Sequence, residues 1–159
     1  MKVTTLLFVG LPVIVSTSFL MFTLQSPFIF IAQLKFTSLI FSLFSGVYWG
    51  FNLKDFKPDD QESISIARLI LGFLPILVSF GSLIVDPMLS FLLLSFGLIS
   101  MIPLNYHWSK LGLLPKWFGI YFLSIAFITI FSLIFSFWSY VRYYKLQAIK
   151  KNLQEEITE

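Results

Sequence analysis

"FGIYFLSIAFITIFSLIFSFWSY", residues 118–140, contains 23 residues and no charged side chain. A helix of this length, rising about 1.5 Å per residue, reaches roughly 35 Å, which is enough to cross the ~30 Å hydrocarbon core of a bilayer. The stretch therefore predicts a transmembrane helix.

The composition of the whole chain indicates the same environment. Of the 159 residues, 57% are hydrophobic, 19% are aromatic and 12% are charged, and the mean hydropathy is +0.88. Soluble domains carry about 25% charged residues. We therefore expect an all-α integral membrane bundle of about five transmembrane helices, with a C-terminal helical extension and no separate soluble domain. The chain has no Cys, which excludes disulfides and thiol catalysis.

Apolar runs separated by polar residues set the expected organisation. Spans are predicted at about 4–24, 28–53, 64–85, 88–106 and 118–140. Residues 1–141 would form the bundle, and residues 142–159 an amphipathic helical tail. Asp86 and Pro87 divide the third span from the fourth, which favours a tight hairpin with Asp86 as the helix cap; an ion ligand is the alternative role of this carboxylate.

The charges leave the orientation open. Lys and Arg residues are divided almost evenly between the two predicted faces, so the positive-inside rule gives a weak preference. The first helix favours an amino terminus inside, while the basic tail argues for the reverse. We expect the bacterial inner (cytoplasmic) membrane, or the mitochondrial inner membrane if the protein is eukaryotic.

Small residues recur at every fourth position of the second span. They are Ser38, Ser42, Gly46 and Gly50, which on a helix form one slowly drifting stripe. Small side chains let two helix backbones approach closely, and this packing holds transmembrane helices together. We expect a helix-packing stripe, with a groove for a lipid tail or a pigment as the alternative.

The four Trp residues are predicted to lie near the membrane surfaces, where amphipathic aromatic rings gather. They are Trp49, Trp108, Trp117 and Trp138.

Three stretches carry a family resemblance. "FTSLIFSLFSGVYWG" (36–50), "ARLILGFLPILVSF" (67–80) and "GLLPKWF" (112–118) resemble the small membrane proteins of domain of unknown function 3429, the family of mitochondrial transmembrane protein 69, which also has bacterial members. The resemblance covers about residues 5–135 and implies a five-span bundle with no established activity.

Two positions depart from that family pattern. Asn105 stands where relatives usually have an acidic residue after the fourth span, and Phe122 stands where they usually have an Arg early in the fifth. If the two charges pair in relatives, their joint loss is physically sensible, because one uncompensated charge near the bilayer is costly.

Catalytic patterns are missing from the sequence. His107 is the only His, so no two-His metal site can be built, and the carboxylates lie in predicted loops or in the tail. No phosphate-binding glycine loop occurs, and the net charge of +3 is modest for nucleic-acid binding. We expect no enzyme activity, no catalytic residue, no metal and no cofactor.

Two charged or titratable residues keep alternative roles. For His107, an interfacial hydrogen-bonding role is weighed against a ligand or proton-relay role. For Arg68, at the start of the third span, a headgroup anchor or ion-pair partner is weighed against a substrate clamp.

The tail, "VRYYKLQAIKKNLQEEITE" (141–159), contains no Gly or Pro and should continue the fifth helix beyond the membrane. Its apolar stripe consists of Leu146, Ile149, Leu153 and Ile157. The stripe is predicted to dock on a partner protein; an amphipathic helix lying on the lipid surface is the alternative.

These features favour an accessory or structural subunit of a larger membrane complex, such as a respiratory or other energy-transducing one. Its expected partners are the lipid bilayer and other membrane-protein subunits, and bound lipids are compatible with it. The alternative function is a small carrier or lipid-binding membrane protein that uses the groove of the second span.

Overall fold

A computed structural model of the protein describes residues 3–24, 26–54, 62–110 and 114–158. These residues form five α-helices, which confirms the all-α bundle. The helices are α1 (Val3–Leu24), α2 (Pro27–Lys54), α3 (Glu62–Ile84), α4 (Pro87–Lys110) and α5 (Lys116–Thr158). Each helix starts within a few residues of its predicted span.

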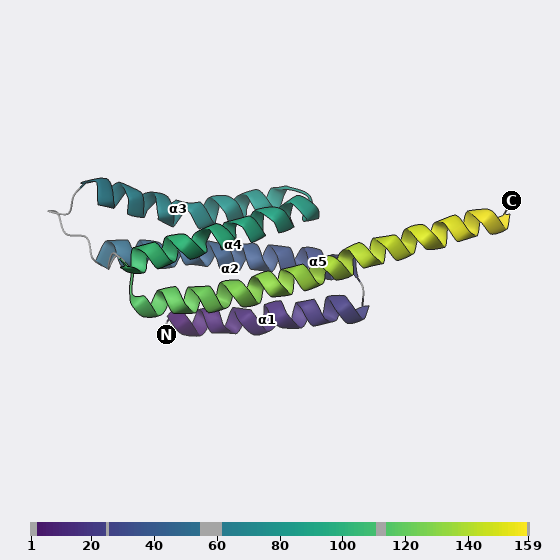
Figure 1. Ribbon diagram of the computed structural model, residues 1–159, viewed down its shortest axis with the longest axis horizontal. Coiled ribbons are helices and arrows are strands. Elements are labelled where there is room, and N and C mark those ends of the chain that lie inside the picture. Colours follow the sequence, from purple (N-terminus) through teal and green to yellow (C-terminus); the bar gives the residue numbers. More distant parts are fainter. Residues whose placement is uncertain (1–2, 25, 55–61, 111–113, 159) are drawn as a thin grey trace.

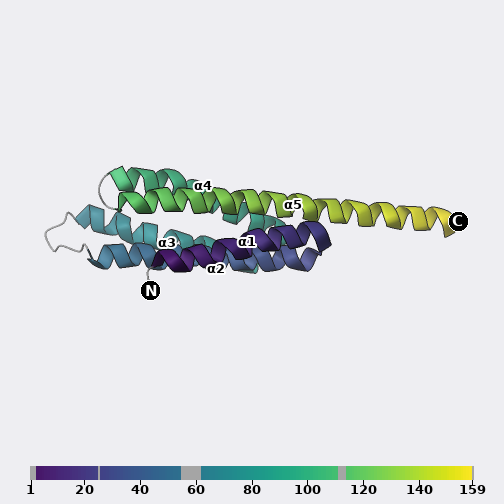
Figure 2. The same cartoon turned by 90° about the horizontal axis from the view of Figure 1, so that it is seen from below.

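The helices pack side by side, and α2 contacts each of the other four. α2 pairs most extensively with α3, while α5 packs between α1 and α4. Figures 1 and 2 show the carboxyl ends of α2 and α4 at the same end of the bundle as the amino ends of α1, α3 and α5. The last part of α5 projects beyond the opposite end, because this 43-residue helix is much longer than its neighbours.

Aromatic side chains fill the centre of the bundle. Phe30, Phe41, Phe44, Phe118 and Phe122 are among the largest fully buried side chains. The rings of Phe44 on α2 and Phe122 on α5 meet edge to face, with centroids 5.0 Å apart. Such geometry suits aromatic pairs, whose ring edges are positive and whose faces are negative.

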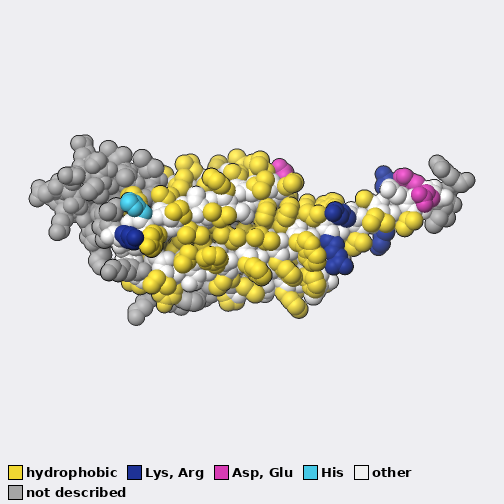
Figure 3. All heavy atoms as spheres, viewed as in Figure 1, with side chains coloured by type: hydrophobic (Ala, Val, Ile, Leu, Met, Phe, Trp, Pro, Cys, Tyr) yellow, Lys and Arg dark blue, Asp and Glu magenta, His cyan; other side chains and the backbone are white. Residues whose placement is uncertain are grey.

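The outer surface of the bundle is also hydrophobic. On the face in Figure 3, the coloured side chains over the bundle are mostly hydrophobic, and charged groups appear toward the ends and along the projecting helix. Phe96 and Phe131 are 73% and 75% exposed. A soluble monomer rarely exposes so much continuous apolar surface, so this belt suits contact with lipid.

In the part of the chain that the structure describes, three helices are long and apolar enough to cross a membrane: Pro27–Gly50, Pro87–Lys110 and Trp117–Glu156. Within the described residues, α1 and α3 contribute the shorter apolar segments Pro12–Leu24 and Gly72–Ile84. The chain therefore has the character of a membrane protein, and full crossing by α1 and α3 remains a prediction.

The hairpin between α3 and α4 is capped as predicted. The backbone N–H groups of Met88 and Leu89 donate to Oδ1 of Asp86 at 3.0 and 3.2 Å. The start of a helix leaves its first N–H groups unpaired, and this carboxylate satisfies two of them. The capping role of Asp86 is thus confirmed.

Candidate functional site

The predicted small-residue stripe divides into two parts. Ser38 is buried, and its Oγ lies 2.6 Å from Oγ of Ser82 on α3. Ser42 is half-buried and donates to Leu39 O of its own helix. Gly46 and Gly50 are exposed, and a Cβ placed at either glycine meets no atom within 4 Å among the described residues, apart from its chain neighbours and the nearby backbone of α2. The close approach expected at these two glycines is therefore not found among the described residues.

Helix geometry explains why the stripe divides. Residues four apart differ by about 40° around a helix, so twelve residues turn Gly50 about 120° away from Ser38. The face that meets α3 instead continues through Ser45, whose hydroxyl donates to Gly72 O.

Gly72 itself is needed because a Cβ there would lie 2.9 Å from Nε1 of Trp49. A second close contact involves Gly97 on α4, where a Cβ would lie 2.7 Å from Cγ1 of Val78.

The four Trp residues have different surroundings. Trp49 is half-buried and meets Phe73 of α3 edge to face at 5.2 Å, and Trp108 is half-buried against the hydrophobic core. Trp117 and Trp138 are exposed at 45% and 54%. These two lie on α5 at a separation of roughly 30 Å along the helix axis, the thickness of a bilayer core. They are therefore the pair best placed to mark the two membrane surfaces.

A buried hydrogen bond joins α2 to α4. The hydroxyl of Tyr48 donates to Oδ1 of Asn105 at 2.6 Å, and Nδ2 of Asn105 donates to Met101 O at 2.7 Å. The Tyr48 ring also meets Phe118 of α5 edge to face at 5.6 Å. The ring centroids of Phe118 and Phe122 lie 6.4 Å apart, so a series of contacts through Tyr48 and Phe118 links Asn105 to Phe122.

A second buried polar cluster joins α1, α2 and α5. Gln33 is fully buried, and its Nε2 donates to Oγ of Ser18 at 2.7 Å. The Ser18 hydroxyl donates to Ser132 O at 3.2 Å. Sequence reasoning missed this cluster, although a lone Gln inside an apolar span was a usable signal. Hydrogen bonds of this kind fix the registry of helices in a medium that offers no water.

Residues 3–138 match the family described as Protein of unknown function (DUF3429). The chain belongs to this family. Neither a curated protein nor a solved structure matches the chain. The DUF3429 match covers the bundle and ends before the tail of residues 142–159.

Asn105 and Phe122, the two positions expected to depart from the family pattern, lie close together in the bundle. The family resemblance implies an acidic residue and an Arg at these two positions, and both positions lie in the buried junction of α2, α4 and α5. Here Oδ1 of Asn105 accepts from Tyr48, Nδ2 donates to Met101 O, and the Phe122 ring packs on Phe44. A neutral hydrogen bond and an aromatic pair thus occupy these two positions.

The tail continues α5 without interruption, as expected. Leu146, Ile149 and Leu153 are 41%, 55% and 52% exposed. Ile157 lies in the same helix, and its side chain falls outside the described part of the structure. At the base of the tail, Cζ of Arg142 lies 5.7 Å from the centre of the Trp138 ring, and further out Lys151 Nζ pairs with Glu155 Oε1 at 3.8 Å.

The remaining candidate residues stand apart from these features. His107 is exposed in the last turn of α4. Arg68 lies in α3, but its side chain is outside the described residues. Among the described side chains, no group of three His, Cys, Asp or Glu residues is placed to hold a metal ion.

Proposed function

We propose that this DUF3429 protein is a non-catalytic accessory subunit of a larger membrane complex, and that its tail docks on a partner subunit. The observation that carries the proposal is the stripe of Leu146, Ile149 and Leu153, exposed on a helix that projects beyond the bundle. An energy-transducing complex of the bacterial or mitochondrial inner membrane, with the amino terminus inside, is the expected setting.

The length of α5 supports a docking role. The helix has 43 residues, and a rise of 1.5 Å per residue gives it a length of roughly 65 Å, about twice the bilayer core. With Trp138 and Arg142 at the membrane surface, the apolar stripe lies outside the lipid. Exposed apolar side chains at helical spacing on a water-exposed helix are typical of a helix that lies in the groove of another protein.

The charges of the tail favour a protein partner over the lipid surface. Anionic lipid attracts basic helices, yet Glu155 and Glu156 lie at the outer end of the tail. Lys151 is already engaged by Glu155. A groove with an apolar floor and basic residues beside Glu156 would fit the stripe and the acidic end together.

Native gel electrophoresis after extraction in mild detergent tests the proposal. The variant Ile149→Asp with Leu153→Asp should leave the complex and migrate as a smaller species. Gln147→Asp with Ala148→Asp is the matched control, because it adds the same charge on the opposite side of the helix. The control should stay in the complex, and both variants should melt like the parent.

Mass spectrometry of the parent band should identify at least one other membrane-protein subunit. Retention of the double variant at parental stoichiometry would show that the stripe is not the docking element. Migration of the parent itself as a free monomer would contradict the accessory role.

A further inference from the structure

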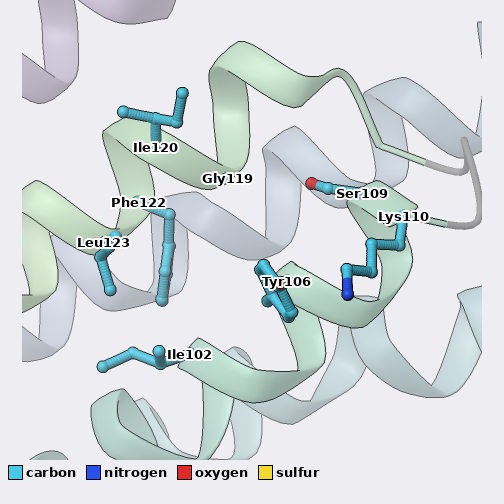
Figure 4. Close-up of a pocket in the computed structure, with 8 residues that line it drawn as sticks. All are labelled: Ile102, Tyr106, Ser109, Lys110, Gly119, Ile120, Phe122 and Leu123. Atoms are coloured by element: carbon cyan, nitrogen blue, oxygen red, sulfur yellow. The ribbon is translucent and has the colours of Figure 1, made fainter.

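A cavity of about 560 Å³ lies between the carboxyl end of α4 and the start of α5 (Figure 4). Its volume falls within the roughly 300–1,000 Å³ that small-molecule sites usually have. The part of its lining that lies deepest in the bundle is hydrophobic, with Ile102 from α4 and Phe122 and Leu123 from α5. This part suits an alkyl chain.

The other end of the cavity carries one cation. Ser109 and Lys110 line it in the last turn of α4, about 12 Å along the helix from Ile102. Nζ of Lys110 lies 4.5 Å from the centre of the Tyr106 ring, and no carboxylate of the described residues pairs with it. The Ser109 hydroxyl is buried and has no hydrogen-bond partner among the described residues. The hydroxyl therefore faces protein rather than the cavity, and Lys110 is the cation at the end of an apolar slot.

The cavity opens to the side of the bundle. Ile120 and Tyr106, which line it, are 69% and 62% exposed. Both belong to the apolar belt that suits contact with lipid, so a molecule can enter from the bilayer. The change from apolar to cationic lining runs along the helix axes toward the bundle end, which is how a phospholipid is arranged in a membrane.

We propose that this cavity binds one anionic phospholipid from the surrounding bilayer. An acyl chain lies along Ile102 and Leu123, and the headgroup phosphate lies beside Lys110, where an ammonium and a phosphate attract each other strongly. Ser109 packs against α5 at Gly119, where a Cβ would lie 2.8 Å from Ser109 Oγ. The proposal goes beyond tail docking and does not depend on it.

Native mass spectrometry of the full chain, reconstituted with defined lipids, tests the site. We expect one retained phosphatidylglycerol per protein, in preference to phosphatidylcholine. Lys110→Gln should weaken phosphatidylglycerol retention about fivefold, the effect of one basic residue near an anionic lipid surface. Lys145→Gln, which removes an exposed cation at the other end of the bundle, should have no such effect.

A second pair of variants tests the apolar part. Leu123→Trp fills the slot and should abolish retention, whereas Leu92→Trp, at an exposed lipid-facing position of α4, should leave it unchanged. Equal retention of the two lipids by the parent, or an equal loss in Lys110→Gln and Lys145→Gln, would overturn the proposal and indicate surrounding lipid without a specific site.

Discussion

Tyr48 and Asn105 form a buried side-chain hydrogen bond between α2 and α4, with the Tyr48 hydroxyl 2.6 Å from Oδ1 of Asn105. Both side chains are nearly inaccessible, at 4% and 2% exposure. Water cannot reach either group, so the Tyr48 hydroxyl and the Asn105 carbonyl oxygen each depend on the other for a hydrogen bond. The bond fixes α2 against α4 at the point where relatives are expected to carry charge.

Tyr48→Phe should destabilise the bundle by about 1–3 kcal/mol, because it leaves the Asn105 carbonyl buried without its donor. Asn105→Leu should also be destabilising. The double variant should lose less than the sum of the two, with a coupling free energy of about 0.5–2 kcal/mol. Thermal unfolding in detergent, followed by circular dichroism, measures all three. Strictly additive losses would show that the hydrogen bond carries no coupling.

The glycines of α2 and α4 should respond differently to alanine. Gly97→Ala places a methyl group 2.7 Å from Val78 Cγ1 and 3.1 Å from Phe41 Cε1, so we expect a loss of about 1–3 kcal/mol from overpacking. Gly46→Ala meets open space and should be neutral, or more stable by up to about 1 kcal/mol because alanine favours helix. Unfolding of the two variants side by side checks this. If Gly46→Ala were destabilised while Gly97→Ala unfolded like the parent, Gly46 and not Gly97 would lie at a helix–helix contact, which would contradict the structure.

The cap of α4 gives a third prediction. Asp86→Ala removes the acceptor for two N–H groups and should cost about 0.5–2 kcal/mol, while Asp86→Asn keeps an acceptor oxygen and should recover most of it. Amide hydrogen exchange in the first turn of α4 should be slowest in the parent, faster in Asp86→Asn and fastest in Asp86→Ala. Equal exchange rates in the two variants would contradict a capping role.

The sequence predicted the helices well because local signals define them. The second span was expected at 28–53 and α2 is Pro27–Lys54; the fourth was expected at 88–106 and α4 is Pro87–Lys110. The length of each apolar run sets the length of each span. Asp86 and Pro87 mark the boundary between two spans, because Asp caps a helix start and Pro suits the first helical position. The unbroken tail followed from the absence of Gly and Pro.

The packing faces were harder to predict because they depend on partners distant in the chain. A spacing of four residues placed Gly46 and Gly50 on the stripe of Ser38, whereas the observed face follows Ser38, Phe41, Ser45 and Tyr48, at alternating spacings of three and four. The bond between Tyr48 and Asn105 joins residues 57 positions apart, so no local pattern indicates it. The sequence analysis singled out Asn105 because it differs from the expected family pattern, but it did not predict Tyr48 as its hydrogen-bond partner.

The docking role of the tail requires that residues 142–159 leave the membrane opposite the amino terminus. The chain has no native Cys, so single-Cys variants can be labelled cleanly in sealed vesicles with an impermeant maleimide. Cys at Asp59, which lies outside the described residues, and at His107 should label from one side. Cys at Asp86 and at Asn152 should label only from the other side. A chain that crosses the membrane five times has the turn at Asp86 and the tail on the side opposite Asp59 and His107. Labelling of His107→Cys and Asn152→Cys from the same side would contradict a membrane-crossing α5, and with it the proposed position of the tail.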